Sequence, residues 1–192
     1  MIIQTWYDIS LEKEAGLKES LSSILFAISL IFGEGHYSVA EAAQKAGISP
    51  KTVQIALKTP QILNYAHILD VIAKTIYAEA QGESEDGKKA VASVIWNRAN
   101  GNVANFEQVI KKRNQFSCWN GKVDLNPGRG VPWLESVRIA RSMVAGEFSP
   151  TVEHTHYYNP EKADPSWAYT DKTRTKLRDH IDIGHHRFLT AQ

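Results

Sequence analysis

The sequence predicts a mainly α fold (α+β class) with little strand. Apolar residues recur at steps of three and four, which is the period of one face of a helix. Serine, glycine and proline stand where such stretches would begin and end. From Ser149 onward the pattern turns irregular and aromatic, and only one short hairpin is expected there, around "HTHYYN". The 192 residues suffice for one domain with a proper core, or for one domain and a small appendage.

The composition is that of an ordinary globular protein. Lys and Arg number 22 against 21 Asp and Glu, so the net charge of +1 points to neither nucleic acid nor an anionic membrane as a partner. The single cysteine, Cys118, excludes an internal disulfide framework. No cofactor motif is recognised.

The most apolar stretch is Leu21 to Phe32, "LSSILFAISLIF". It is too short to span a bilayer. The preceding residues hold four acidic side chains against two lysines, whereas the start of a secretory signal should be positive. We therefore expect a buried helix, synthesis in the cytoplasm without a clear signal peptide, and no stable membrane insertion.

Two parts are expected, a small helical accessory region over residues 1–65 and a longer domain over residues 66–192. The break is placed near "KTPQILNYAH", because Pro60 disfavours helix at Thr59. Targeting to the cell wall is one role for the first part, although no residue pattern demonstrates it.

A helix-turn-helix pattern lies inside the first part. Ser38 is placed to cap a helix that Gly47 ends, and Ser49 to cap the next, with Pro50 at its first position. DNA binding is one interpretation. However, residues 1–67 carry five Lys or Arg against six Asp or Glu, and a DNA-binding module should be basic. A helical hairpin without nucleic acid is therefore favoured.

The second part opens with two helices. The first should weaken or end at Gly82, and Ser84 is a plausible N-cap of the second. Apolar positions of the two helices are Leu69, Ile72, Ala73, Ile76, Tyr77 and Ala80, then Ala90, Val91, Val94 and Ile95.

Two more helices are expected downstream. Asn105 is placed to cap a short helix through Ile110. The stretch "GRGVPWLESVRIARSMVAGE" predicts a helix with Pro132 near its start and Gly146 at its end. Its inward positions are Val137, Ala140 and Val144.

Glu79 is the first candidate catalytic residue. It stands at the end of an apolar helix face. Partial burial disfavours an ionised carboxylate, and a carboxylic acid that keeps its proton near neutral pH is a usable general acid. Cleavage of a glycosidic bond needs such an acid for the leaving oxygen. A solvated helix-end glutamate is the competing interpretation.

Glu83 is the second candidate. If the helix continued through Gly82, the two carboxylates would share a face with Cβ atoms about 6 Å apart. A retaining glycosidase needs its two carboxyl groups about 5 Å apart. In the alternative, Glu83 lies in the turn, where it caps the next helix or bonds to Asn97 or Arg98, and supports the site.

Two segments mix aromatic rings with amides and hydroxyls, "RNQFSCWNG" and "HTHYYNPEKADPSWAYT". Such mixtures suit sugars, which present apolar C–H faces beside hydroxyl groups. Ordinary core packing of each aromatic residue is the competing interpretation. The candidate substrate-binding residues are Gln115, Phe116, Ser117, Trp119, His156, Tyr157, Tyr158, Asn159 and Trp167.

A metal or thiol mechanism is less favoured. The potential zinc ligands are His154, His156, His180, His185, His186 and Cys118, but no H-E-x-x-H motif or paired-cysteine spacing is present. We expect no metal. Cys118 as a nucleophile ranks lower still.

The segment "IYAEAQGESEDGKKAVASVIWNR" resembles the opening of the SleB/CwlJ-type cell-wall hydrolase domain, the spore cortex-lytic enzyme family. The shared pattern consists of Tyr77, Glu79, Ala80, Gly82, Glu83, Gly87, Ala90, Val91, Asn97 and Arg98. Four further pieces, "QFSCWN", "THYYNP", "PSWA" and "IGHHRF", follow in the family's order, so the resemblance covers about residues 68–189.

The resemblance implies a lysozyme-like fold and cleavage of peptidoglycan between N-acetylmuramic acid and N-acetylglucosamine. Lytic transglycosylases of the family use one glutamate, which corresponds to Glu79 here. A true muramidase using Glu79 and Glu83 is the alternative, as is a wall-binding or DNA-binding protein without catalysis. A metal-dependent amidase or peptidase acting on the peptide stems is a further rival.

A small wall-cutting enzyme without an export signal resembles a bacteriophage endolysin. Such a protein reaches the wall through a separately made membrane hole, a holin. A virion-borne enzyme or an otherwise exported bacterial enzyme is the alternative. We therefore expect bacterial peptidoglycan as the partner, a role in cell lysis or wall remodelling, and a monomer.

Overall fold

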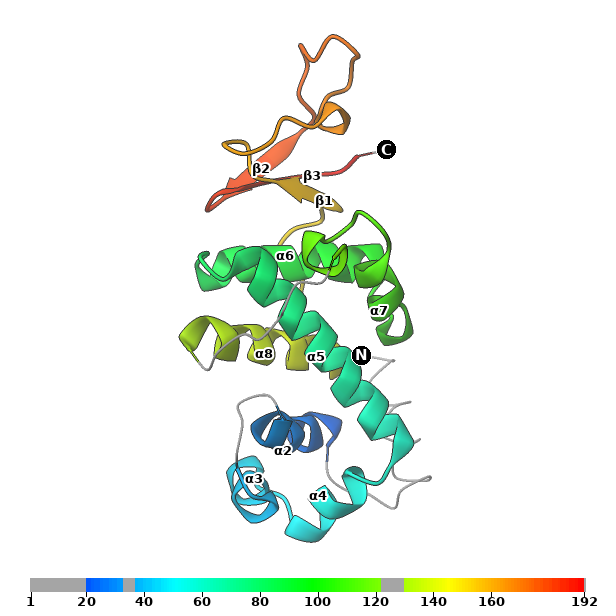
Figure 1. Ribbon diagram of the computed structural model, residues 1–192, viewed down its shortest axis with the longest axis vertical. Coiled ribbons are helices and arrows are strands. Elements are labelled where there is room, and N and C mark those ends of the chain that lie inside the picture. Colours follow the sequence, from blue (N-terminus) through cyan, green and yellow to red (C-terminus); the bar gives the residue numbers. More distant parts are fainter. Residues whose placement is uncertain (1–19, 33–36, 122–129, 192) are drawn as a thin grey trace. The chain divides into compact units, whose positions relative to one another are not determined.

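The computed structural model describes residues 20–32, 37–121 and 130–191, which are mainly helical with one small sheet (Figure 1). The prediction of a mainly α fold with little strand is confirmed, and the architecture is consistent with the lysozyme-like class. Its α-helices are α2 Leu21–Phe32, α3 Val39–Ala46, α4 Pro50–Ala56, α5 Pro60–Ala80, α6 Glu85–Arg98, α7 Val103–Lys111 and α8 Val131–Val144. Its 3-10 helices and strands are η1 Ser117–Trp119, β1 His156–Tyr158, η2 Ser166–Ala168, β2 His180–Ile183 and β3 His186–Leu189.

The chain forms two compact units, each described separately. The first contains the described residues up to 74 together with 130–148, and the second contains 75–121 and 149–191. Helix α5 contributes residues to both. The boundaries of these two units differ from the expected division into residues 1–65 and 66–192. That division stays a prediction about functional domains.

The first unit is built from capped helices around the apolar α2. Seven of the twelve residues of α2 are buried, as expected for a core helix. Ser38 and Glu41 form a reciprocal capping box at α3, and Gly47 ends that helix with φ +68°. Ser49 caps α4 beside Pro50. The predicted caps are therefore confirmed, while the acidic segment before α2 lies outside the described residues.

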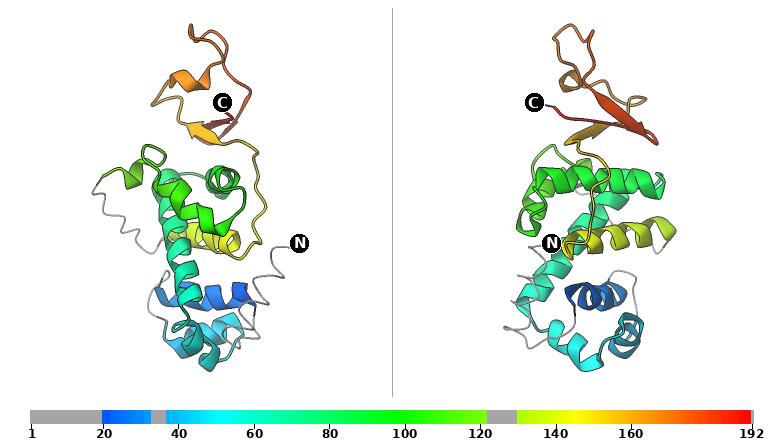
Figure 2. Two further views of the ribbon diagram at one scale, coloured as in Figure 1. Left: turned by 90° about the vertical axis from the view of Figure 1, so that its right-hand side faces the viewer. Right: turned by 180° about the vertical axis from the view of Figure 1, so that it is seen from behind.

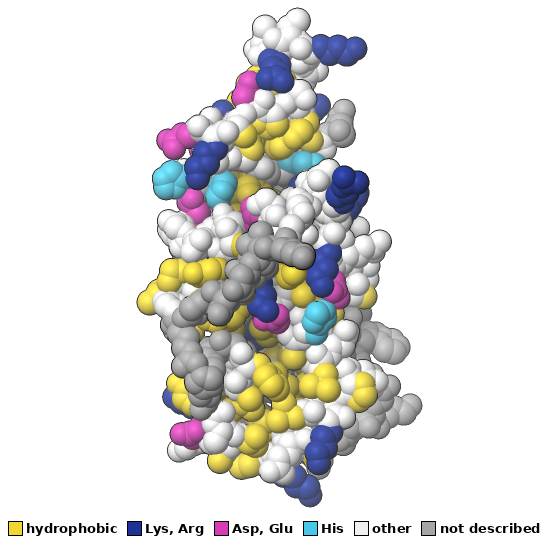
Figure 3. Space-filling model, viewed as in Figure 1, with side chains coloured by type: hydrophobic (Ala, Val, Ile, Leu, Met, Phe, Trp, Pro, Cys, Tyr) yellow, Lys and Arg dark blue, Asp and Glu magenta, His cyan; other side chains and the backbone are white. Residues whose placement is uncertain are grey.

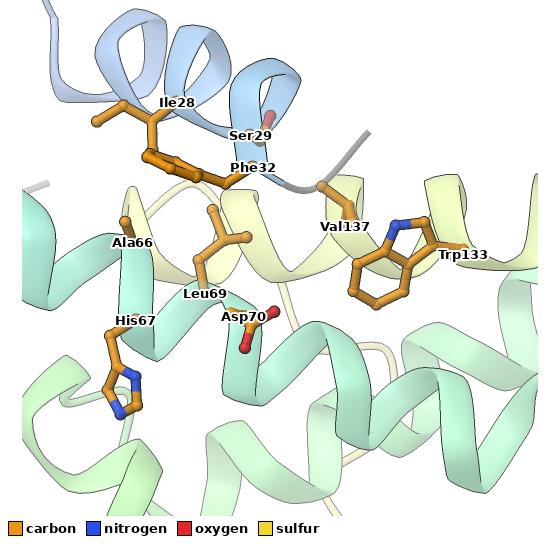
Figure 4. A pocket seen from close by; sticks show the side chains of 9 residues that line it. All are labelled: Ile28, Ser29, Phe32, Ala66, His67, Leu69, Asp70, Trp133 and Val137. Atoms are coloured by element: carbon orange, nitrogen blue, oxygen red, sulfur yellow. The ribbon is translucent and has the colours of Figure 1, made fainter. Parts of the chain in front are cut away.

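An apolar cavity of about 220 Å³ lies between α2, α5 and α8 in this unit (Figure 4). Phe32, one of its lining residues, is 66% exposed. His67 and Asp70 contribute its polar edge, and Asp70 also pairs with Lys74 at 2.7 Å. The lining residues are Ile28, Ser29, Phe32, Ala66, His67, Leu69, Asp70, Trp133 and Val137.

In the second unit, a tight turn joins α5 to α6. Helix α5 ends at Ala80, just before Gly82, and the Ser84 hydroxyl accepts the Gly87 backbone N–H as the N-cap of α6. Asn102, not Asn105, caps α7, because the helix begins with the buried Val103. The predicted N-cap at Asn105 was therefore wrong by three residues.

A three-stranded antiparallel sheet completes the second unit. Strand β3 lies between β1 and β2 (Figure 2). Tyr157 is paired with Phe188 across β1 and β3. The hairpin expected around "HTHYYN" was therefore wrong: β1 pairs with a strand some thirty residues later, whose buried Phe188 and Leu189 supply the apolar partners.

The described residues contain no helix that is long and apolar enough to cross a membrane.

Candidate active site

Glu79 lies in the last turn of α5, where two separate segments of the second unit donate hydrogen bonds to its carboxylate. Oε1 accepts from the backbone N–H of Ser117 at 3.1 Å and from its hydroxyl at 3.2 Å. Oε2 accepts from the Tyr157 hydroxyl at 3.0 Å. Three donors from η1 and β1 thus fix both carboxylate oxygens of a half-buried side chain.

Tyr157 is held from several sides. Its ring meets His186 edge-on at a centroid distance of 5.0 Å and packs against Phe188 at 5.6 Å. Burial, followed by the neighbouring Glu79 carboxylate, raises the pKa of Tyr157 well above its usual value of 10.0. Its hydroxyl therefore stays protonated and donates to Glu79 across the working pH range of most enzymes.

Cys118 lies in η1 beside this carboxylate but is suited to packing. The residue is 7% exposed. Burial, followed by the charge of Glu79, raises the pKa of its thiol from 9.0 to about 12. A thiol that stays protonated at neutral pH is a poor nucleophile. This geometry disfavours the cysteine mechanism.

Glu83 lies in the turn between α5 and α6, so the two glutamates do not share a helix face. Its side chain is 7% exposed. Oε2 accepts the His185 backbone N–H at 3.2 Å, and Oε1 lies 3.0 Å from Nδ1 of the same residue. The partners suggested from the sequence, Asn97 and Arg98, were wrong: both bond elsewhere.

Two glycines make room for the Glu83 side chain. A Cβ on Gly184, which has φ +59° in the turn between β2 and β3, would lie 1.8 Å from Glu83 Oε2. A Cβ on Gly87, in the first turn of α6, would lie 2.8 Å from Glu83 Cβ. The carboxylate thereby bridges the α5–α6 turn to the β2–β3 turn.

His186 and Lys88 complete this bridge. His186 Nδ1 is buried without a hydrogen bond among the described residues, and it lies 3.7 Å from Glu83 Oε1. Burial lowers the pKa of His186, although both Glu79 and Glu83 act in the opposite direction. The buried Lys88 donates to the backbone carbonyl of Glu83.

Asn97 and Arg98 hold the segment that leads into β1. The Asn97 amide donates to the carbonyls of Val152 and His154, both at 2.9 Å. Arg98 Nε donates to the Thr155 carbonyl at 2.5 Å, and its guanidinium lies 5.6 Å from the Phe116 ring centroid. Sequence reasoning missed this anchoring role, because the partners are 55 to 57 residues away.

The predicted substrate-binding residues fall into three groups. Ser117 and Tyr157 contact Glu79, and the buried Phe116 packs beside Tyr157 at 6.5 Å. Trp167 is 38% exposed and meets the rings of His156 and Tyr158 at 5.3 and 5.7 Å. The structure gives the remaining three no contact with Glu79: Gln115, Trp119 and Asn159.

Those three have local roles in the structure. The Trp119 indole N–H donates to the Thr75 hydroxyl at 2.9 Å, and Lys111 lies over its ring. Asn159 accepts the backbone N–H of Glu161 at 2.9 Å and shapes the turn after β1. Gln115 is half-buried just before η1.

Across the part of the chain that the structure describes, no three His, Cys, Asp or Glu side chains are grouped as metal ligands. Histidine and acidic side chains lie near one another on the face shown in Figure 3. Among the described residues of these types, Glu83 Oε1 lies 3.0 Å from His185 Nδ1. That contact is a pairwise bridge.

A family of known proteins matches the part of the chain that carries most of these residues, from Gly82 onward. The model of the cell wall hydrolase family matches residues 82–189, which is more than half of the chain. The chain belongs to the cell wall hydrolase family. The match covers the Glu83 bridge, Ser117 and the sheet that carries Tyr157.

Curated relatives of this family member are spore cortex-lytic enzymes. The enzyme of Oceanobacillus iheyensis is 29% identical over 118 residues, covering 59% of this chain and 40% of the relative. Those of Bacillus cereus and Bacillus subtilis strain 168 are each 27% identical, covering 59% and 58% of this chain and 42% and 35% of the relative. The chain thus spans about two fifths of the length of these relatives. No solved structure matches it.

Proposed function

We propose that this cell wall hydrolase cleaves the glycan strand of peptidoglycan between N-acetylmuramic acid and N-acetylglucosamine, as a lytic transglycosylase with Glu79 as its acid and base. One observation carries the proposal: three hydrogen-bond donors fix the Glu79 carboxylate at the end of α5. Membership of the family and the spore cortex-lytic relatives support the substrate class.

In this proposal Glu79 acts twice. As the acid, it gives its proton to the glycosidic oxygen while the bond from that oxygen to the muramic C1 breaks. As the resulting carboxylate, it takes the proton from the muramic C6 hydroxyl, whose oxygen bonds to C1 and closes a 1,6-anhydro ring. The proton returns to Glu79, so no water is consumed. Ser117 and Tyr157 orient the carboxyl group for both steps, and their hydrogen bonds stabilise the carboxylate that remains once the proton has been given up.

Glu83 has a positioning role in this proposal. Its carboxylate is 7% exposed and bonded to His185, which leaves it poorly available to attack a sugar carbon or to activate water. By holding the β2–β3 turn against the α5–α6 turn, it supports the sheet that presents Tyr157. A muramidase using both glutamates is the alternative.

The aromatic residues around Trp167 are the proposed sugar platform. Trp167 is partly exposed, and His156 and Tyr158 support its ring. An exposed aromatic face that is held by neighbouring rings suits the C–H face of a sugar. Gln115, Phe116, Trp119 and Asn159 stay predicted substrate-binding residues, with Phe116 acting through the support of Tyr157.

The test is mass spectrometry of fragments released from purified peptidoglycan by the wild type, Glu79→Gln and Glu83→Gln. We expect muramic ends that are one water lighter than hydrolysed ends, absent with Glu79→Gln and still formed by Glu83→Gln. Binding of Glu79→Gln to wall pellets should persist.

Other outcomes would reject the mechanism. Reducing muramic ends that require both glutamates would mean a true muramidase. Cut peptide stems with intact glycan would mean an amidase or peptidase. Wall binding without fragments from any variant would mean a non-catalytic module.

We further propose an endolysin-like role in bacterial lysis, with release to the wall through a holin. Co-expression with a holin should lyse cells, and expression alone should not. Lysis that does not depend on the holin would contradict this route.

A further inference from the structure

A polar cavity lies in the second unit, beside the sheet and apart from the residues that bond Glu79. Its volume is about 490 Å³. The residues that line it are His154, Thr170, Lys176, Leu177, Arg178, Asp179 and Thr190. The proposed mechanism assigns no role to any of them.

The cavity wall is a loop with a fixed backbone. Asp171 accepts the backbone N–H groups of Thr175 at 3.1 Å and Lys176 at 2.8 Å. The carbonyl of Lys176 in turn accepts the Thr170 backbone N–H at 2.8 Å and its hydroxyl at 3.1 Å. The backbone N–H and carbonyl of Lys176 are therefore both hydrogen-bonded, so the side chain of this lysine extends from a fixed backbone.

The cavity is joined to the proposed sugar platform by direct contacts. Arg178 donates its backbone N–H to the Ala168 carbonyl at 2.9 Å and its Nε to the Trp167 carbonyl at 3.1 Å. The Trp167 ring packs on His156, which precedes Tyr157 in β1. A chain of contacts therefore runs from the Glu79 carboxylate to this loop, entirely within the second unit.

Positive charge exceeds negative charge in the cavity. Lys176 and Arg178 line it together with one acidic residue, Asp179. Within the described residues, the Lys176 ammonium has neither an ion-pair nor a hydrogen-bond partner, and Arg178 uses only its Nε. Two cationic groups on a fixed loop, beside the hydroxyls of Thr170 and Thr190, suit a carboxylate next to an amide.

We propose that this cavity binds a free carboxylate of the peptide stems that the glycan strand carries. The proposal rests on the proposed function, since it names a further part of the same substrate. Each peptide stem is joined to a muramic sugar through an amide, which leaves that sugar without a charge. The anionic groups of the strand therefore lie on the peptides. A strand whose sugars lie along Trp167 would present a stem to the neighbouring loop.

The test compares Lys176→Gln with Lys172→Gln on two substrates: peptidoglycan with its stems, and the same glycan after the stems are removed enzymatically. Lys176 is exposed and bonds only through its backbone, so its variant should fold. Lys172 is a matched control because it is an exposed lysine of the same loop that does not line the cavity. We expect Lys176→Gln to raise KM about threefold to tenfold on stem-bearing glycan. On stripped glycan, both variants should match the wild type.

Binding of a free stem peptide separates this inference from the proposed function. NMR titration of the whole protein with the peptide should show saturable binding that Lys176→Gln weakens and Lys172→Gln leaves unchanged, even if no glycan is cleaved. Inorganic phosphate is the competing probe. Equal losses on both substrates, no loss on either, or a preference for phosphate over the peptide would overturn the proposal.

Discussion

Replacement of Gly184 by alanine should test the bridge between Glu83 and the β2–β3 turn. The new Cβ would lie 1.8 Å from Glu83 Oε2, so the carboxylate or the turn must move. Glu83 has little freedom to move, because its side chain is 7% exposed and bonded to His185. The substitution should therefore disturb the contacts of Glu83 as well as the turn itself.

Two costs add in this variant. A residue with a Cβ at φ +59° lowers the free energy of unfolding by about 1–2 kcal/mol relative to glycine. Displacement of the Glu83 carboxylate from the His185 backbone N–H removes one charged hydrogen bond, which contributes about 1.5–3 kcal/mol. The contact with the His185 ring adds little, because that ring is 63% exposed. The expected loss is about 2.5–5 kcal/mol of the free energy of unfolding.

Denaturant unfolding, followed by circular dichroism and tryptophan fluorescence, measures this loss. Gly47→Ala is a control, since Gly47 has φ +68° with nothing within 4 Å of an added Cβ, and it should lose only about 1–2 kcal/mol. In a double-mutant cycle with Glu83→Ala, the cost of alanine at residue 184 should fall to the control value. A coupling energy within about 0.5 kcal/mol of zero would refute the reasoning.

Three further predictions concern the residues around Glu79. Tyr157→Phe should lower kcat about tenfold to a hundredfold with little change in the melting temperature, because it removes one hydrogen bond to Glu79 and keeps the ring packing; unchanged kcat would contradict this role. Cys118, whose pKa burial raises to about 12, should resist iodoacetamide at pH 8 until the protein is denatured, and rapid labelling of the folded protein would contradict its burial. Burial lowers the pKa of His186 below 6.5, so the folded state favours the neutral ring. The contribution of this neutral ring to stability is present above pH 6.5 and is lost as the pH falls below that value. The melting temperature of the wild type should therefore decline between pH 6.5 and 5, and that of His186→Gln should decline less steeply. Some decline should remain in the variant, because the pKa of His156 is also lowered. Equal slopes in the two proteins would contradict the assignment.

The helix ends were predictable because their signals are local. Ser38, Ser49 and Ser84 each accept a backbone N–H three residues later, so a short window of sequence contains both the cap and its partner. The cap predicted at Asn105 was wrong because Asn102, three residues earlier, has the same capping chemistry and precedes the helix. The position of Glu79 at the end of an apolar helix was readable for the same reason.

The partners of the site residues were not predictable in the same way. Tyr157 lies 78 residues from Glu79, and His185 lies 102 residues from Glu83. Nothing in the residues around Glu83 indicates which of several histidines approaches it. Gly184 was a weak sequence signal of a tight turn before the two histidines, but its close approach to Glu83 is visible only in the folded structure.

The strand order has a consequence for when the candidate site can form during synthesis of the protein. Strand β1, which presents Tyr157 to Glu79, pairs only with β3, about thirty residues further along. Contacts between distant residues form late in folding, because a long loop must first close. The α-helices of the second unit can form on a growing polypeptide, but Tyr157 has no strand to pair with until residues 186–189 have left the ribosome. A nascent chain therefore lacks the contact between Tyr157 and Glu79 until nearly the whole described sequence has been synthesised.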